Sequence, residues 1–252
     1  MFGQEGYGLR LEWGGEGVAA LGGLCAVLVV VDVLSFTTAA DVVVGRGGRV
    51  KPVSWLDRST AAPTANPAWT LRPASLDTVP PGELLELPSP NGATLCDLAG
   101  RTGATVLAGC LRNADAVARA ALEIADGRPI GVIPAGERWG IDINTAKSEQ
   151  HFGPLRPCVE DFLGAGAVLS ALLEQSPVRA SVEAQVAADA YRGTAARLGE
   201  VIADCVSGRE LIEAGHAADV AVATRVNISK AAPCLVDGVL MSHEPSPRPY
   251  DT

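Results

Sequence analysis

The stretch VVVDVLSFTT, Val29–Thr38, decides the fold of this chain. Its valines favour a strand, and a continuous apolar run bounded by polar residues is typical of a strand buried on both faces of a sheet. Ser35 or Thr37 can then cap a helix that runs through the following alanines and valines. A buried strand that leads directly into a helix predicts a layered α/β fold with a mostly parallel sheet.

Asp32 interrupts this apolar run. An ionised carboxylate is unfavourable in such surroundings unless hydrogen bonds or an opposite charge compensate it. Asp32 is therefore either a structural acid that accepts hydrogen bonds from nearby N–H groups or an acid retained for chemistry. Its place inside the apolar run, several residues before the helix, favours the second interpretation.

The bulk composition indicates one large α/β domain. The chain has 252 residues, of which 48% are hydrophobic and 19% charged, so a sizeable core can form. We expect residues 1–245 to form a single domain, either as one unit or as two lobes, and residues 246–252 to form a loose tail. The net charge of −9 argues against nucleic acid or an anionic membrane as a partner.

The six cysteines form no CxxC pair, which is typical of reduced thiols. The start of the chain does not resemble a signal peptide, and no apolar run approaches the roughly 18 residues of a membrane-spanning helix. We therefore expect a cytoplasmic protein. The three histidines are far apart in sequence and do not show zinc-ligand spacing.

Strands and helices are expected to alternate along the chain. The predicted strands are Leu9–Trp13, Cys25–Leu34, Val50–Val53, Glu83–Pro88, Ala104–Cys110, Pro129–Gly136, Ala218–Val226 and Cys234–Met241, the last as a hairpin around Asp237-Gly238. The predicted helices are Phe36–Gly47, one within Ser89–Arg101, Asn113–Gly127, Cys158–Gln175, and Val182–Gly215 with breaks near Gly193 and Gly208. Two segments, Ser54–Pro81 and Glu137–Pro157, are expected to be irregular.

Four predicted strands end in small or polar residues. Ligands of open α/β sheets bind outside the carboxyl ends of the strands, and helix N-termini there present N–H groups suited to phosphate. The polar residues at these junctions are Asp32, Thr37, Thr38, Asn91, Asn113, Glu137 and Arg138. Simple capping or turn formation is the alternative for Ser35, Thr37, Asn91 and Asn113, and helix-dipole stabilisation is the alternative for Glu160 and Asp161.

Five motifs follow one another in order: VVVDVLSFTTA, SPNGAT, GCLRNADAVA, the AG of VIPAGER, and CVEDFLGAGAVLSAL. Together they resemble the 2-phosphosulfolactate phosphatase family, the ComB-like proteins of coenzyme M biosynthesis. The resemblance implies a magnesium-dependent acid phosphatase on a three-layer α/β/α fold with a mostly parallel or mixed sheet. The positions that match the family motifs are Asp32, Asn91, Asn113, Gly136, Glu160 and Asp161.

The chain departs from the family pattern at three places. Ser35 and Phe36 stand where members often have Arg and Ala, so a possible anion-binding cation is absent. RPASLDTVPPG (72–82) replaces an expected Asn-Ser-Pro segment, and GIDINTAKSEQHF (140–152) has no counterpart. These changes leave the identity of the substrate open.

The expected catalytic residues are Asp32, Glu160 and Asp161. Mg²⁺ prefers oxygen ligands, and we expect Asp32 and Asp161 to bind it, alone or together with Glu160. A carboxylate or a metal-bound water would supply the nucleophile. The expected substrate-binding residues are Ser35, Thr37, Thr38, Asn91, Gly92, Asn113, Gly136, Glu137 and Arg138. Arg138 or Arg112 could hold a second anionic group.

Other phosphatase mechanisms do not fit the sequence. No cysteine is followed by an arginine six positions later, Asp32-Val33-Leu34 lacks the second acid of DxDx[TV], and GxxxxGK[ST] is absent. The expected partner is a small anionic phosphorylated substrate, and a homodimer is one possible assembly. The alternative function is a non-catalytic protein that binds an anionic metabolite on the same scaffold.

Overall fold

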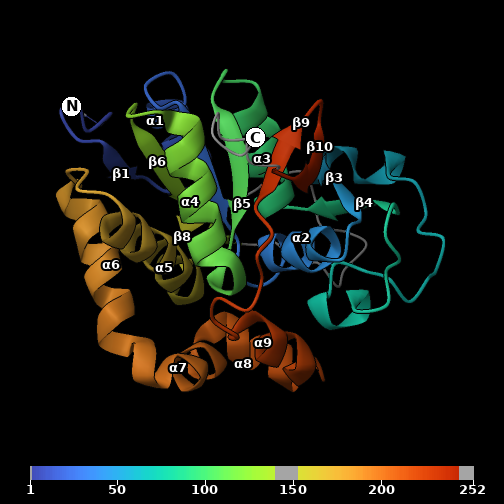
Figure 1. Cartoon of the computed structure of the whole chain (residues 1–252). Helices are drawn as coiled ribbons and strands as arrows, with labels where there is room; N and C mark the ends of the chain where they lie inside the picture. Colours follow the sequence, from blue (N-terminus) through green and yellow to red (C-terminus); the bar gives the residue numbers. More distant parts are fainter. Residues whose placement is uncertain (1, 140–152, 244–252) are drawn as a thin grey trace, which may run out of the picture.

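A central sheet of eight strands organises the protein (Figure 1). The computed structural model describes residues 2–139 and 153–243. The strand order is β1-β6-β2-β5-β9-β10-β3-β4. The strands are β1 (Leu9–Leu11), β2 (Val27–Val31), β3 (Arg49–Ser54), β4 (Leu84–Ser89), β5 (Thr105–Gly109), β6 (Ile130–Pro134), β9 (Pro233–Val236) and β10 (Val239–Ser242).

The sheet is mixed. Strands β1, β6, β2 and β5 run parallel, and Val29 of β2 lies between Leu107 of β5 and Val132 of β6. The hairpin β9–β10 reverses the direction, since β9 is antiparallel to β5 and β10 is antiparallel to β3. Strands β3 and β4 are again parallel to each other. The carboxyl ends of β2, β5 and β6 therefore lie at one edge of the sheet.

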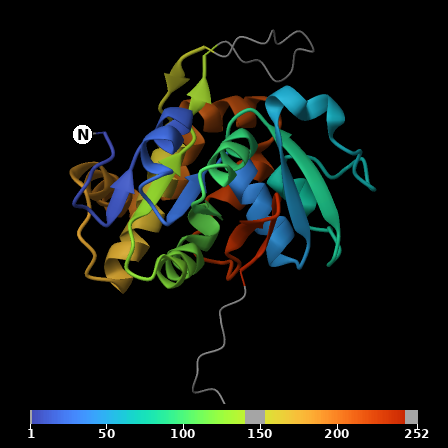
Figure 2. The same ribbon diagram turned by 90° about the horizontal axis from the view of Figure 1, so that it is seen from above.

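Helices cover both faces of the sheet (Figures 1 and 2). The α-helices are α1 (Gly14–Leu21), α2 (Phe36–Gly45), α3 (Gly92–Gly100), α4 (Ala114–Ala125), α5 (Val159–Gln175), α6 (Val182–Thr194), α7 (Leu198–Asp204), α8 (Val206–Glu213) and α9 (Ala217–Ala223). Short 3-10 turns are η1 (Trp55–Thr60), η2 (Pro73–Leu76), η3 (Leu111–Asn113) and η4 (Ala195–Arg197). A second, two-stranded sheet pairs β7 (Glu137–Arg138) with β8 (Leu155–Arg156).

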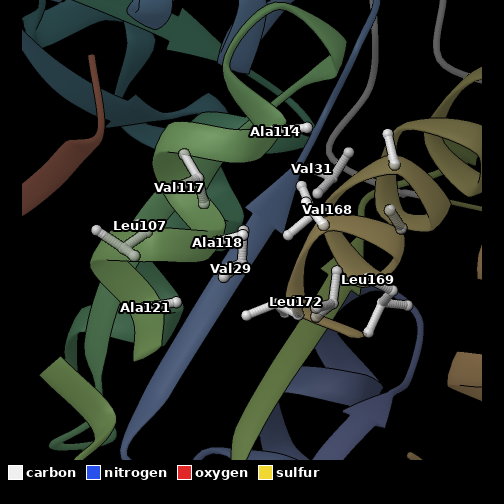
Figure 3. Packing of buried hydrophobic residues seen from close by; sticks show 14 of the residues in the cluster. Val29, Val31, Leu107, Ala114, Val117, Ala118, Ala121, Val168, Leu169 and Leu172 are labelled. Atoms are coloured by element: carbon white, nitrogen blue, oxygen red, sulfur yellow. The ribbon is translucent and has the colours of Figure 1, made fainter. Parts of the chain in front are cut away.

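Two hydrophobic clusters lie on opposite faces of β2 because successive side chains of a strand point in opposite directions. Val29 and Val31 pack against α4 and α5, where Val117 and Val168 are buried (Figure 3). Leu28 belongs to the other cluster, which is formed by residues of α1, α2 and α3. Each such side chain contributes on the order of 1.5–3 kcal/mol when fully buried. The prediction of a three-layer α/β/α fold is confirmed.

A glycine allows α5 to approach the end of β2. A Cβ atom at Gly164 would lie 2.5 Å from Cγ2 of Val33 and 2.9 Å from Cγ1 of Val31. Such distances are shorter than van der Waals contact, so any larger residue would push the helix away. The close approach brings Glu160 and Asp161, in the first turn of α5, to the carboxyl end of β2.

Most predicted elements are confirmed with shifts of a few residues at their ends, including the hairpin around Asp237-Gly238. The strand predicted at Ala218–Val226 is wrong. Residues 218–223 of this segment belong to α9, whose buried Val220 and Ala223 are three residues apart and lie on one face of the helix. The break predicted near Gly208 falls instead at Cys205, and Gly208 lies within α8.

The segments predicted to be irregular contain short regular pieces. Ser54–Pro81 includes η1 and η2, and Glu137–Pro157 begins and ends with the strands β7 and β8. GIDINTAKSEQHF (140–152) and the predicted tail (246–252) lie outside the described residues. All six cysteines are free, as expected. In the parts of the chain that the structure describes, no helix has the length and apolar character needed to cross a membrane.

Candidate active site

Four carboxyl groups meet at the carboxyl ends of β2 and β6. Asp32 directly follows β2, Glu137 lies in β7 just beyond β6, and Glu160 and Asp161 come from the first turn of α5. Asp32, Glu160 and Asp161 are buried, with 3%, 3% and 4% of their surface exposed, and Glu137 is partly buried. The charge of Glu160 helps to raise the pKa values of Asp32, Glu137 and Asp161, and the charge of Asp32 helps to raise those of Glu137 and Asp161. We use the name acidic cleft for this cluster of four side chains, and not for a cavity.

Asp32 is held by backbone N–H groups from two chain segments. Its Oδ2 accepts a hydrogen bond of 2.7 Å from Gly92 N, and its Oδ1 accepts one of 3.3 Å from Phe36 N. Burial raises the pKa of Asp32 to about 6, although these hydrogen bonds favour the charged form and Glu160 adds a smaller increase. Asp32 can therefore exchange a proton close to neutral pH.

Asp161 joins the ends of two strands. Its Oδ1 accepts a hydrogen bond of 2.8 Å from Val33 N, and its Oδ2 accepts one of 2.8 Å from Gly136 N. Gly136 has φ of +65°, a backbone conformation that glycine adopts without strain. Burial, followed by the charges of Asp32 and Glu160, raises the pKa of Asp161 well above its usual value. Through these two hydrogen bonds, the Asp161 carboxylate holds the backbone at Val33 and Gly136 in place beside the other acids.

Glu137 is paired with an amide from another strand end. Asn91 Nδ2 donates a hydrogen bond of 2.6 Å to Glu137 Oε1. Burial, with the nearby charge of Asp32, raises the pKa of Glu137 to about 7. Glu137 can therefore carry a proton near neutral pH, which suits an acid that transfers a proton.

Glu160 contacts a residue that sequence reasoning missed. Cys205, between α7 and α8, lies with Sγ 3.2 Å from Glu160 Oε2 and can donate its thiol proton. Burial and the charge of Glu160 raise the pKa of the Cys205 thiol to about 12, so the thiol stays protonated. No motif marks Cys205, because the contact depends on how the helices after α5 fold back over the cleft.

Three side chains that were expected to bind the substrate form hydrogen bonds with backbone groups instead. Thr37 Oγ1 donates to Asp32 O at 2.7 Å, and Thr38 Oγ1 donates to Val33 O at 2.8 Å. Asn113 Oδ1 accepts from Cys110 N at 2.8 Å, and its Nδ2 donates to Ala108 O at 3.3 Å. These contacts shape the strand ends that surround the cleft. They leave the three side chains little capacity to bind a substrate directly.

Ser35, Asn91 and Asn113 occupy the N-cap positions of α2, α3 and α4, but none of their side chains makes a capping hydrogen bond. The N–H groups at the start of α2 and α3 donate instead to Asp32, because Phe36 and Gly92 are the first residues of these helices. At the starts of α2 and α3, Asp32 therefore accepts the hydrogen bonds that a capping side chain would otherwise accept.

The two arginines considered for a second anionic group lie in different cavities. Arg138 lines a cavity of about 260 Å³ together with Asn91, Gly14 and Gly15, and its Nη2 lies 3.4 Å from Glu16 Oε2. Arg112 pairs with Asp41, Nε to Oδ2 at 2.7 Å, and lines another cavity. Of these two arginines, Arg138 is therefore the one next to the cleft.

The acidic cleft offers carboxylate oxygens, which are the type of ligand that Mg²⁺ prefers. Within the described ranges, no three or more His, Cys, Asp or Glu side chains converge as a ready metal centre. Mg²⁺ nevertheless needs only one or two carboxylates, because water and substrate oxygens complete its octahedral shell. Asp32 and Glu160, which interact electrostatically, can provide such a pair.

The fold and the cleft together define the class as a three-layer α/β/α protein with an acidic site at the carboxyl end of its parallel strands. The chain belongs to the 2-phosphosulpholactate phosphatase family, whose model matches residues 80–238, more than half of the chain. Proteins of this family are phosphoric monoester hydrolases. Comparison with curated proteins gives no significant match.

The matched range includes three of the four acids of the cleft, Glu137, Glu160 and Asp161, together with Asn91 and Gly92. Asp32 precedes the range. The structure joins Asp32 to the matched range through the hydrogen bond from Gly92, and Asp32 lies close enough to Glu160 and Asp161 for their negative charges to repel one another.

Proposed function

We propose that the protein hydrolyses a small anionic phosphate monoester, 2-phosphosulfolactate or a related phosphorylated acid, in a magnesium-dependent reaction. The observation that carries this proposal is the convergence of Asp32, Glu137, Glu160 and Asp161 at one edge of the sheet. Membership of a phosphatase family supports the reaction class. The net charge of −9 means that an anionic substrate needs local positive charge at such a site.

Hydrolysis forms a bond between water oxygen and phosphorus, breaks the ester P–O bond and transfers a proton to the departing oxygen. We assign the proton to Glu137, since a carboxyl group with a pKa of about 7 can donate it at neutral pH. Asp32 would act at the phosphoryl group in one of two ways. It would either take a proton from the attacking water, or attack phosphorus itself and form an aspartyl phosphate, whose Asp–phosphorus bond a water molecule would then break. Both roles require the ionised form of Asp32.

Asp32 and Glu160 would hold the cation, and Asp161 could add a ligand through the lone pairs that its two backbone hydrogen bonds leave free. When bound, Mg²⁺ would offset the repulsion between the carboxylates and the substrate. Asn91 would keep Glu137 oriented, and Arg138 would face the second anionic group of the substrate.

The proposal is tested by phosphate release from a panel of small phosphorylated carboxylic and sulfonic acids, with and without Mg²⁺. We expect turnover of at least one panel member, and its loss in EDTA. Asp32→Asn should abolish this turnover, whereas Glu183→Gln, which changes an exposed acid in α6, should not. Binding detected as a rise in melting temperature, without turnover of any panel member, would favour the alternative of a non-catalytic metabolite-binding protein.

A further inference from the structure

A cavity of about 260 Å³ adjoins the acidic cleft on the side of α1 and α3, two helices that pack against each other. Its wall includes Asn91, whose Nδ2 donates a hydrogen bond of 2.6 Å to Glu137 of the cleft. Asn91 therefore lies between the cavity and the acids. Since a water molecule takes about 30 Å³ in the liquid, the cavity has room for the few heavy atoms of a short-chain acid.

The walls of this cavity are mostly apolar. Leu95, Leu98 and Ala135 line it, and Arg138 is the one charged side chain among the described residues that do so. A Cβ atom at Gly15 would lie 3.8 Å from Cδ1 of Leu98 and 3.9 Å from Nη2 of Arg138, so this glycine leaves open the space beside the guanidinium group. Apolar walls with a few polar groups that fix orientation are typical of sites for small ligands.

Glu16 is the partner of Arg138 at the protein surface. It lies in the first turn of α1, and its side chain is 74% exposed, against 23% for Arg138. Arg138 Nη2 lies 3.4 Å from Glu16 Oε2, whereas charge-assisted N–H···O bonds typically measure about 2.7–2.9 Å. An ion pair that is both long and exposed contributes little to stability. An anion in the cavity can therefore replace Glu16 as the partner of Arg138.

On the basis of the function proposed above, we propose that Glu16 competes with the second anionic group of the substrate for Arg138. Glu16 pairs with Arg138 while the cavity is empty and is displaced when a carboxylate or sulfonate enters. An uncharged group in the cavity does not displace it. The substrate and its dephosphorylated product carry the same second anionic group, so Glu16 lowers the affinity for both and favours release of the product.

Calorimetric titration with Mg²⁺ at pH 7 and an ionic strength of about 0.15 M tests this competition with two probes. 3-Phosphonopropionate carries a carboxylate, and propylphosphonate carries a methyl group in its place. Neither probe contains an ester bond, so both bind without turnover. Glu16→Gln should tighten the binding of 3-phosphonopropionate about threefold and change that of propylphosphonate less than about 1.5-fold, since the pair that is lost is a surface pair.

Arg138→Gln should weaken the binding of 3-phosphonopropionate about tenfold, because the guanidinium group is its partner. Adding Glu16→Gln to this variant should have no further effect, since no guanidinium group is left to compete for. Glu183→Gln is the matched control, because it also removes an exposed acid from the first turn of a helix, α6. It should change the affinity for either probe less than about 1.5-fold.

Three results would each overturn the competition: no tightening in Glu16→Gln, equal tightening for both probes, or the same tightening with and without Arg138. Absence of 3-phosphonopropionate binding would overturn it as well. Loss of the expected pattern in an active phosphatase would contradict the role of Glu16 alone. The expected pattern in a protein that releases no phosphate from the ester panel would support the role of Glu16 and contradict the phosphatase reaction.

Discussion

Gly92 donates its backbone N–H to Oδ2 of Asp32 at 2.7 Å, which joins the start of α3 to the end of β2. A Cβ atom at Gly92 would lie 2.6 Å from this oxygen and 2.8 Å from Cβ of Asp32. Position 92 therefore requires glycine, because there is no room for a Cβ atom. The carboxylate of Asp32 is thus held by a residue 60 positions away in the sequence.

The first prediction concerns this contact. Gly92→Ala should push Asp32 and α3 apart, lower phosphatase activity at least tenfold and reduce the free energy of unfolding by about 1–3 kcal/mol. Gly199→Ala is the control, because a Cβ there meets nothing within 4 Å and alanine favours the helix by roughly 0.5–1 kcal/mol. Chemical denaturation and phosphate release measure both effects. Unchanged activity of Gly92→Ala would refute the steric requirement.

The second prediction separates Asp32 from Asp161. Asp32→Asn should reduce turnover more than a hundredfold, because an amide can neither attack phosphorus nor accept a proton from water. Asp161→Asn should mainly destabilise, by about 1–3 kcal/mol, since an amide can no longer accept both the Val33 and the Gly136 hydrogen bonds. Circular dichroism melting and turnover should be measured on both variants. Asp32→Asn also loses one of two backbone hydrogen bonds, so turnover and not stability distinguishes the two residues. Equal losses of turnover in the two variants would contradict the separate roles.

The third prediction concerns Glu137. If its protonated form is the proton donor, activity should fall as the pH rises through about 7. Glu137→Gln keeps an oxygen that can accept the Asn91 hydrogen bond but loses the proton, so this descending limb should disappear along with most of the activity. The measurement is the pH profile of kcat. A variant that retains the limb at the same pH would exclude Glu137 as the donor.

The fourth prediction is a dependence of stability on pH and Mg²⁺. The folded-state pKa values of Asp32 and Glu137 rise from 3.8 to about 6 and from 4.5 to about 7. The folded protein therefore binds more protons than the unfolded chain in this window, and these two groups make stability fall as the pH rises from about 4 to about 7. The melting temperature should be lower at pH 8 than at pH 5.5.

Mg²⁺ should raise the melting temperature more at pH 8 than at pH 5.5, because protons occupy the carboxylates at the lower pH. In the variant Asp32→Asn/Glu137→Gln, the melting temperature should depend less on pH and should rise less on addition of Mg²⁺. An Mg²⁺ effect of the same size in this variant would show that the cation binds elsewhere.

The sequence predicts the layers of the fold well because their signals are local. The apolar run that ends at Val31 specifies β2, and the residues around Asp237 specify the terminal hairpin. The strand prediction for the segment around Val220 is wrong because the short alternating pattern of alanine and valine in this segment suits a strand as well as a helix. Tertiary packing selects the helix, since Val220 and Ala223 are buried on one face of it.

The acids of the cleft could also be named from sequence, but their partners could not. The Asn91–Glu137 and Cys205–Glu160 contacts span 46 and 45 positions and depend on the route of the chain between them. The same limit applies to Asn113, whose position suggests a ligand but whose amide is bound to Cys110 and Ala108. Sequence spacing therefore indicates which strand ends meet, whereas hydrogen bonds decide which side chains remain available.

The β9–β10 hairpin is synthesised after every other strand, yet it occupies the middle of the sheet between β5 and β3. Until it is added, β5 and β3 each present an open edge with unpaired backbone groups, which can join other chains. A nascent chain must therefore keep these two edges apart from each other and from neighbouring chains. A premature stop codon just before Pro233 would split the sheet and favour aggregation.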